Sequence, residues 1–307
     1  MRQKRKSVVI TGASSGIGRS SVLRMAKAGW RVFATVRKPA DRDKLQSENI
    51  PGVVPLLMDM EDRPSIFAAA EQVASQLGGE SLDGLVNVAG IGMFGPVEYA
   101  SAGNLQKIFD VNFFGQVATT QVLLPLLRAG RGRIVNISSV GAHIAIPFGA
   151  LLNASKAAFG ILTDNLRLEL HPFGIRVSTI EPGSIATPAV DKTLGNIESV
   201  IASLPPEGRA QYGEMLRTAA KRGYKREMSG SPPEVVARAV HHALTAARPR
   251  IRYRVGKDAK LIGTLPRILP DRLLDAIRLR ALGLPTKFDA ANQFEKKRPG
   301  RPVALRA

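Results

Sequence analysis

The chain has no cysteine, few aromatic residues and no long apolar run. The absence of cysteine excludes disulfides and thiolate chemistry. Aromatic residues make up 5% of the chain and form no pattern of stacking platforms, so we expect no nucleic acid as a partner. A membrane-spanning helix needs about 20 consecutive apolar residues, and no stretch approaches that length. Because the basic residues 1–6 lead directly into a strand-like run, we predict a cytoplasmic protein.

Acidic residues are also scarce relative to basic ones. The chain holds 44 Lys and Arg against 25 Asp and Glu, a formal net charge of +19. The basic residues are spread along the chain and become dense after Arg248. Such a surface attracts a phosphorylated cofactor or anionic lipid, and a solvated basic surface without a specific ligand is an equally good interpretation.

Apolar, β-branched runs alternate with helical patterns along most of the chain. The strand-like runs cover residues 7–10, 31–36, 53–57, 84–88, 133–137, 176–180 and 251–255, and the helical patterns include 63–77, 102–127, 151–171 and 233–246. This alternation predicts right-handed β-α-β units in a doubly wound parallel α/β sheet with helices on both faces.

The stretch 7–29 has the pattern of a strand, a tight turn and a helix. Gly12, Gly16 and Gly18 stand between the strand and the helix in the frame G-x-x-x-G-x-G. Glycine permits the sharp turn and lets the backbone approach a ligand, while the N–H groups of the helix start attract an anion. We therefore predict that this turn binds the pyrophosphate of a dinucleotide.

The end of the second strand indicates whether the dinucleotide is NAD(H) or NADP(H). An acidic residue at this point commonly binds the adenosine ribose 2′-hydroxyl, but this chain has Val36 followed by Arg37 and Lys38. An arginine can bind a 2′-phosphate in a charge-assisted pair, which predicts NADP(H) over NAD(H).

Several short motifs follow one another in a familiar order. They are Thr11 to Gly18 (TGASSGIG), Leu57-Met58-Asp59-Met60, Asn87-Val88-Ala89-Gly90, Asp110-Val111-Asn112, Ile137-Ser138-Ser139, Ala154-Ser155-Lys156 and Glu181-Pro182-Gly183. Together, from about Val8 to Val255, they resemble the classical short-chain dehydrogenase/reductase family, nearest the subgroup with estradiol 17β-dehydrogenases and retinol dehydrogenases. The resemblance implies a single Rossmann-type domain of about seven strands, a homodimer or homotetramer, and an oxidoreductase that interconverts an apolar alcohol and ketone.

The resemblance also implies roles for individual residues. Ser139 binds the substrate oxygen, Lys156 binds the nicotinamide ribose and lowers the pKa of a catalytic tyrosine, and Asn112 holds a proton-relay water. Ser15 and Arg37 meet the 2′-phosphate, and Asp59 binds adenine. The full set of implied cofactor residues is Gly12, Ser14, Ser15, Gly16, Ile17, Gly18, Arg37, Asp59, Met60, Asn87, Ala89, Gly90, Lys156, Pro182, Gly183, Ile185 and Thr187.

One position departs from the family pattern in a way that bears on catalysis. The motif Tyr-x-x-x-Lys places a tyrosine four residues before Lys156, and this chain has Leu152 there. Positions 152 and 156 share one face of a helix, so an ammonium would lie beside the phenol if one were present. Leucine neither donates nor accepts a proton.

Three interpretations of Leu152 remain open. Another group supplies the proton, and His143, Tyr212 and Tyr224 are candidates. Alternatively, the protein binds NADP(H) with little catalysis, or it catalyses a non-redox step. A metal site is not predicted, because the His241-His242 pair lacks further ligands at suitable spacing.

The chain is predicted to divide into a cofactor-binding domain over 1–255 and a basic amphipathic extension over 256–307. Residues 188–231 interrupt the alternation on the carboxyl side of a strand, where ligands of open α/β sheets bind. We expect a substrate lid there, with a plain surface insertion as the alternative. The extension alternates leucine and isoleucine with arginine, which suits docking on the domain, on another subunit or on an anionic membrane. From about Lys296 we predict a disordered tail.

Overall fold

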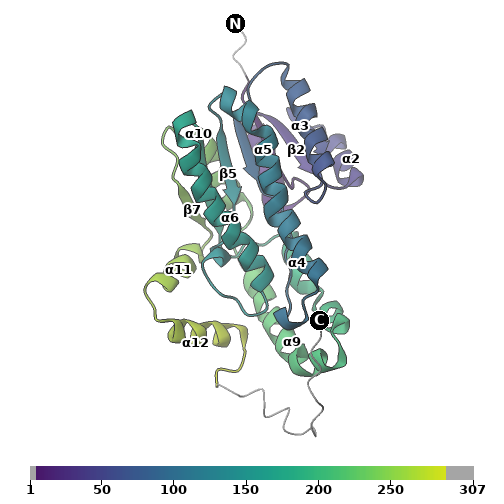
Figure 1. Ribbon diagram of the computed structural model, residues 1–307, viewed down its shortest axis with the longest axis vertical. Helices are drawn as coiled ribbons and strands as arrows, with labels where there is room; N and C mark the ends of the chain where they lie inside the picture. Colours follow the sequence, from purple (N-terminus) through teal and green to yellow (C-terminus); the bar gives the residue numbers. More distant parts are fainter. Residues whose placement is uncertain (1–4, 288–307) are drawn as a thin grey trace.

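A computed structural model describes residues 5–287 of the chain; the predicted tail from Lys296 lies outside them. Its centre is a parallel seven-stranded sheet of order β3-β2-β1-β4-β5-β6-β7 (Figure 1). The strands are β1 (Ser7–Ile10), β2 (Arg31–Val36), β3 (Val53–Leu57), β4 (Gly84–Asn87), β5 (Arg133–Ile137), β6 (Arg176–Pro182) and β7 (Arg252–Val255). The sheet confirms the predicted doubly wound α/β fold.

Helices cover both faces of the sheet and bury its apolar side chains. On one face lie α1 (Gly16–Lys27), α2 (Pro39–Ser47) and α10 (Glu234–Thr245), and on the other lie α3 (Arg63–Leu77), α5 (Gly115–Ala129) and α6 (Ala150–Glu169). β1 is buried along its whole length, as expected of a strand covered on both sides. The direction of strand order reverses between β1 and β4, and ligands of such sheets bind outside the carboxyl ends of the strands at that point.

The predicted helix over 102–127 is interrupted. The structure has α4 (Ala102–Phe109), then one π-helical stretch at Asp110–Phe114, then α5. A π turn admits an additional residue into the helix and is common at functional sites. Its buried residues are Val111 and Asn112, so the widening falls at a predicted site residue.

The segment predicted as a lid is helical and lies at one end of the molecule. It comprises α7 (Pro188–Val190), a π turn at Asp191–Gly195, α8 (Ile197–Ser203) and α9 (Pro206–Met228). The described part of the extension forms α11 (Ala259–Thr264), a 3-10 turn at Leu265–Arg267, and α12 (Asp271–Leu282), which lies beside α9 (Figure 1). None of the helices within residues 5–287 combines the length and apolarity that crossing a bilayer requires.

Candidate functional site

The glycine turn between β1 and α1 is shaped by close backbone contacts. Gly12 has φ +66°, and a Cβ atom there would lie 2.8 Å from Ala89 Cα. A Cβ atom at Gly18 would collide with the carbonyl oxygen of Gly12. Ser15 is the N-cap of α1, and its side chain makes no capping hydrogen bond within the described chain. Ser14 is exposed beside it, and Ile17 is partly buried against the core. The turn therefore leaves the amide end of α1 open to an anion.

The loop after β2 places a guanidinium near this turn. Thr35 O accepts a hydrogen bond from Ala13 N at 2.9 Å, which ties the end of β2 to the turn. Val36 is buried, whereas the side chain of Arg37 is 49% exposed and lies 3.9 Å from the carboxylate of Glu61. An exposed pair at this distance holds the arginine only weakly. Arg37 thus retains the freedom to bind another anion.

The residues predicted to meet the adenine lie at the end of β3. Asp59 Oδ1 accepts from Glu61 N at 3.0 Å, and the Asp59 backbone N–H donates to Ser65 Oγ at 3.0 Å. Met60 is buried against Val111 and the start of α3. These contacts fix the backbone that would line the adenine side of the site.

The end of β4 is held from two sides. Thr11 Oγ1 accepts from the backbone N–H groups of Val88 at 2.8 Å and Ala89 at 3.0 Å. Asn87 Nδ2 donates to Asn136 Oδ1 at 2.9 Å and to Thr120 Oγ1 at 3.0 Å. The side chain of Asn87 therefore ties β4 to β5 and α5. Sequence reasoning missed Asn136 and Thr120, although polar residues within the apolar patterns of β5 and α5 were a usable signal.

Asn112 connects three segments around the predicted reaction centre. Its Oδ1 accepts from Ile91 N at 2.8 Å, and its Nδ2 donates to Ile91 O and to Ser155 Oγ, each at 3.0 Å. The π turn thus clamps the loop after β4 against α6. Gly90 lies in this loop, and a Cβ atom there would stand 3.2 Å from Asn112 Oδ1 and 3.6 Å from Lys156 Nζ. The structure therefore brings Gly90, Asn112 and Lys156 together.

Lys156 is buried on the first half of α6, with its Nζ donating to Ile137 O at 2.9 Å. Burial lowers the pKa of Lys156 to about 8, because desolvation penalises the ammonium form. Leu152 lies one helical turn earlier and is partly buried. Ser139 caps the 3-10 turn that follows β5, and its Oγ accepts from Gly141 N at 2.9 Å. Ser139 thus lies in the turn after β5 and Lys156 on the first half of α6, with Leu152 at the position that the motif gives to tyrosine.

Each of the three candidate proton donors is hydrogen-bonded to a carboxylate. His143 Nε2 lies 2.7 Å from Oε1 of the fully buried Glu181. Although burial alone would favour the neutral acid, hydrogen bonds from His143 and Arg252 hold the pKa of Glu181 below its ordinary value. Tyr212 donates to Glu98 Oε2 at 2.8 Å, and Tyr224 donates to Asp191 Oδ1 at 2.7 Å. No hydrogen bond between these groups and Ser139 is found within residues 5–287.

The loop after β6 closes the site from the other side. Pro182 pairs with Val255 at the end of the sheet, and Gly183 N donates to Val255 O at 2.8 Å. Ile185 is buried in the core beneath α1. A Cβ atom at Gly16 would lie 3.2 Å from Thr187, so this loop and the glycine turn are in contact.

An aromatic cluster joins the lid to two loops of the sheet. The ring of Phe148 lies 5.8 Å from that of Phe94 and 6.1 Å from that of Tyr212, both edge to face. Phe148 has φ +65°, a left-handed conformation that is unfavourable for a bulky residue and tends to occur at functional sites. Phe148 stands four residues before Leu152. Sequence reasoning missed it, because nothing local marks a phenylalanine for positive φ.

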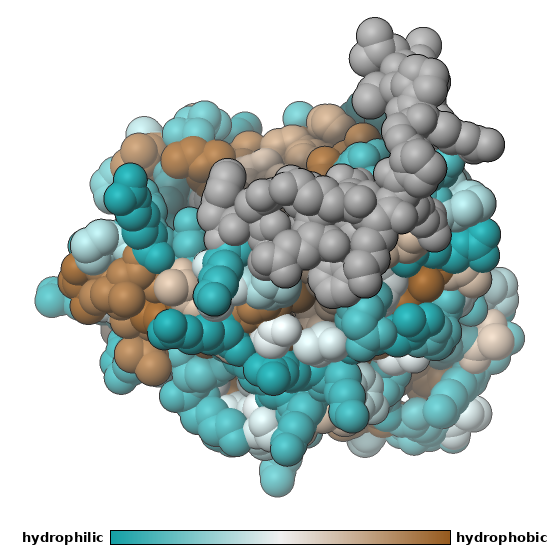
Figure 2. All heavy atoms as spheres, turned by 90° about the horizontal axis from the view of Figure 1, so that it is seen from below, coloured by the Kyte–Doolittle hydropathy of each residue, from teal (hydrophilic) through white to brown (hydrophobic). Residues whose placement is uncertain are grey.

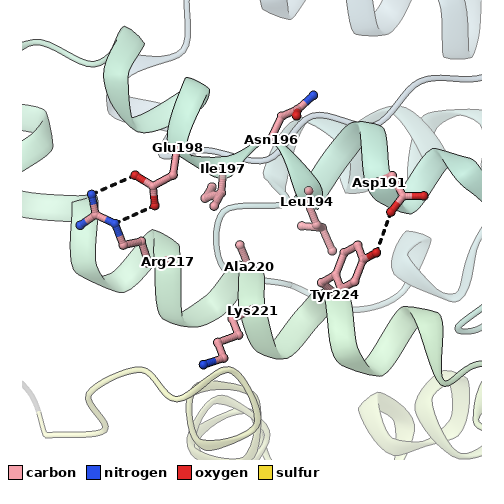
Figure 3. Close-up of a pocket in the computed structure, with 10 residues that line it drawn as sticks. Asp191, Leu194, Asn196, Ile197, Glu198, Arg217, Ala220, Lys221 and Tyr224 are labelled. Carbon is pink, nitrogen blue, oxygen red and sulfur yellow. Dashed lines mark hydrogen bonds and ion pairs between the residues drawn. The ribbon is translucent and has the colours of Figure 1, made fainter.

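A separate cavity of about 680 Å³ lies within the lid (Figure 3). Leu194, Ile197 and Ala220 line its middle, with the Asp191–Tyr224 hydrogen bond at one end and the Glu198–Arg217 ion pair at the other. Its lining includes Tyr224, one of the candidate proton donors, but none of Ser139, Lys156 and Asn112. The cavity is therefore a feature of the lid and not of the Lys156 site.

Comparisons with known proteins agree with this geometry. The short chain dehydrogenase family matches residues 6–197. Retinol dehydrogenase 5 of Mus musculus is 37% identical over 278 residues, covering 88% of this chain and 86% of the relative. The uncharacterized oxidoreductase YbbO of Escherichia coli K12 is 38% identical over 273 residues, covering 89% of this chain and 93% of the relative.

Two solved structures share the fold. A short-chain dehydrogenase from Streptomyces avermitilis superposes with a TM-score of 0.70 at 26% identity, covering 91% of this chain and 95% of that one. A 3-ketoacyl-(acyl-carrier-protein) reductase from Brucella melitensis, complexed with NADH, gives a TM-score of 0.64 at 26% identity, covering 78% and 91%. The glycine turn, the open amide end of α1 and the strand-order reversal fit a nicotinamide dinucleotide. The chain belongs to the short-chain dehydrogenase family and is an oxidoreductase of that family.

Proposed function

We propose that this protein is an NADP(H)-dependent oxidoreductase that interconverts an apolar alcohol with its ketone or aldehyde. The preference for NADP(H) is carried by Arg37, a weakly paired guanidinium at the end of β2 where an acid would repel a 2′-phosphate. Asp59, the acidic residue of the neighbouring strand end, is occupied by a backbone amide. The cofactor, when bound, supplies or receives the hydride.

An apolar substrate is supported by an apolar cluster that involves the lid. Phe94 and Phe148 come from the loops after β4 and β5, and Ile201, Leu204 and Leu216 come from the lid. Their packing forms an apolar cluster between the lid and these loops. The retinol dehydrogenase relative carries a name that fits such a steroid-, retinoid- or lipid-like substrate.

The proton is proposed to come from Lys156. It is the ionisable group that remains of the family constellation after Leu152 replaces the tyrosine, and a pKa of about 8 suits an acid that gives and regains a proton near neutral pH. In reduction, the carbonyl carbon receives the hydride and its oxygen receives the proton through a bridging water. Neutral Lys156 then regains a proton from solvent. Ser139 orients the oxygen, and Asn112 holds α6 in position.

A second candidate function is an NADP(H)-binding protein with little turnover. The observation that favours it is that His143, Tyr212 and Tyr224 are each hydrogen-bonded to a carboxylate. Loss of a general acid removes about 10²–10⁴ in rate, so weak residual reduction is expected even then.

The test is NADPH oxidation with retinaldehyde, a steroid ketone and a long-chain aliphatic ketone. Saturable turnover by the unmodified chain supports the proposal. Tight NADPH binding with turnover only in Leu152→Tyr supports the second candidate. Failure to bind NADPH rejects both.

We further propose a cytoplasmic protein that binds anionic membrane surfaces through α11 and α12. Leu261, Ile268, Leu273 and Ile277 are 41–67% exposed. Lys260, Arg267 and Arg272 are exposed among them, a combination that favours an anionic lipid surface. Figure 2 shows apolar side chains gathered on the side of the molecule where α11 and α12 lie. Sedimentation with phosphatidylserine vesicles, weakened by salt and by Leu261→Glu with Ile268→Glu, would support this.

A homodimer or homotetramer is proposed on the apolar surface of α6. Ile161 is 63% exposed and Leu168 is 61% exposed on this helix. Light scattering of the purified chain tests the assembly. A monomer at micromolar concentration would reject it.

A further inference from the structure

The junction between the lid and the loop after β6 contains two carboxyl groups that share one hydroxyl. Ser184 Oγ lies 2.8 Å from Asp258 Oδ2 and 3.1 Å from Glu227 Oε1. Glu227 is at the end of the long lid helix α9, and Asp258 follows β7. Ser184 itself lies between Gly183 and Ile185, in the loop predicted to seat the nicotinamide.

The Ser184 hydroxyl contacts two carboxyl oxygens, and its single hydrogen cannot serve both contacts. A serine hydroxyl has one hydrogen, so it can donate to only one of the two carboxyl groups. Oxygens 2.8 and 3.1 Å apart need a hydrogen between them to be attractive. The second contact therefore requires a hydrogen on a carboxyl group.

Asp258 is the ionised partner. Its Oδ1 accepts from Ser184 N at 3.0 Å, and its Oδ2 accepts from Arg226 at 3.1 Å as well as from the Ser184 hydroxyl. Burial alone would raise the pKa of Asp258, but these hydrogen bonds hold it below its ordinary value. A carboxylate with three donors has no need of a proton.

Glu227 is the group left to carry the hydrogen. Burial is the largest influence on Glu227 and raises its pKa, and it outweighs a hydrogen bond with the Ile185 backbone that favours the carboxylate. The charged groups acting on it are Arg226 on its own helix, which favours ionisation, and Asp258, which opposes it. A protonated Glu227 donates to Ser184 Oγ, and the Ser184 hydroxyl then donates to Asp258.

The junction lies at the end of the long lid helix α9. α9 is 23 residues long, about 34 Å, and Tyr212 of the aromatic cluster lies about 22 Å along it from Glu227. Close backbone contacts support the same end: Ser231 N donates to Ser184 O at 2.9 Å, and Ala186 N donates to Ser231 O at 3.0 Å. We propose that Glu227 is a positioning residue that, as a neutral acid, fastens the substrate lid to the nicotinamide loop, so that its ionisation as pH rises loosens both. The functional part of this inference rests on the proposed NADP(H) site.

The test compares urea unfolding of the cofactor-free wild-type chain, Glu227→Gln, Glu227→Ala and Glu214→Gln between pH 5 and 9. The folded-state pKa of Glu227 is raised, so its stabilising contribution is fully present below about pH 4.5 and is lost as pH rises through the folded value. Glutamine keeps a donor toward Ser184 and cannot ionise. Relative to the glutamine variant, the wild-type folding equilibrium should therefore fall about tenfold per pH unit within that window.

The controls distinguish the effect of protonating Glu227 from the effect of removing its side chain. Glu214 lies on the same helix with its side chain 85% exposed, and Glu214→Gln should follow the wild type. Glu227→Ala should be less stable than Glu227→Gln at every pH. Parallel pH curves for wild type and Glu227→Gln would overturn the proposal.

NADPH titration gives the second readout. Affinity of the wild type should weaken as pH rises, and that of Glu227→Gln should not share this dependence. Failure of NADPH binding would reject the proposed function. The urea measurement needs no cofactor, so it tests the protonated junction independently of that outcome.

Discussion

The proposed cofactor site and the proposed substrate site differ in which atoms form them: the first is formed mainly by backbone and the second by side chains. On the cofactor side, the backbone at Gly12 and Gly18 has no room for a Cβ atom, and the amide end of α1 provides the anion site. On the proposed substrate side, the proposed chemistry depends on the side chains of Ser139 and Lys156, with Leu152 at the position of the family's tyrosine. A backbone site persists through side-chain substitution, whereas a side-chain site can lose a proton donor without any change of fold. Binding and turnover are therefore separable in this molecule.

Among variants that test the separation of binding from turnover, we expect Leu152→Tyr to change the rate of reduction most. The Lys156 ammonium one turn away would lower the pKa of the new phenol and make it an acid, raising the rate of carbonyl reduction by about 10²–10⁴. The rate of NADPH oxidation measures this. Leu152→Phe is the matched control and should give no gain, since it adds the ring without the hydroxyl.

Ser139→Ala should have the next largest effect. Removing a hydrogen-bond donor from the reacting oxygen costs about 10²–10³ in kcat. NADPH affinity should stay unchanged, because Ser139 lies on the substrate side. A loss of NADPH affinity instead would place this serine in the cofactor site and break the division between the halves.

Arg37→Ala should weaken NADPH binding by about 10- to 100-fold and leave NADH binding unchanged, because a charge-assisted hydrogen bond contributes about 1.5–3 kcal/mol. Fluorescence titration with both cofactors measures the effect. Arg42→Ala removes the same charge from the exposed surface of α2 and serves as control. Equal weakening by both variants would show that only net charge matters.

The pH dependence of turnover tests Lys156 as the proton source. Reduction needs the ammonium form, so its rate should hold below the pKa of about 8 and fall about tenfold per pH unit above it, while the oxidation rate rises through the same value. Lys156→Arg keeps the charge and should abolish this decline of the reduction rate above about pH 8. A decline that survives in Lys156→Arg belongs to another group.

His143→Gln should have the smallest effect, within about threefold in kcat, because glutamine can still donate to Glu181 and Arg252 and Arg254 continue to pair with that carboxylate. A loss of 10²-fold or more would make His143 the proton donor and would contradict the assignment to Lys156.

The parts of the site that follow local rules were predictable. Gly12, Gly16 and Gly18 are dictated by the turn, and Arg37 by the strand end that precedes it. The pairing of His143 with Glu181, the left-handed Phe148 and the Ser184 junction join segments that are 38 or more residues apart or depend on packing around them. No local pattern encodes such contacts. The π turn at Asn112 was hidden for a related reason, since its apolar spacing is close to that of an ordinary helix.

The most direct test of the central claim is a single-turnover measurement, with the unmodified chain in excess over NADPH and retinaldehyde or a steroid ketone in saturating amount. The account predicts oxidation of the bound NADPH, with a rate that declines above about pH 8. Bound NADPH that stays reduced at every pH in the unmodified chain, and is oxidised in Leu152→Tyr, would contradict it and identify a cofactor-binding protein whose turnover was lost at one position.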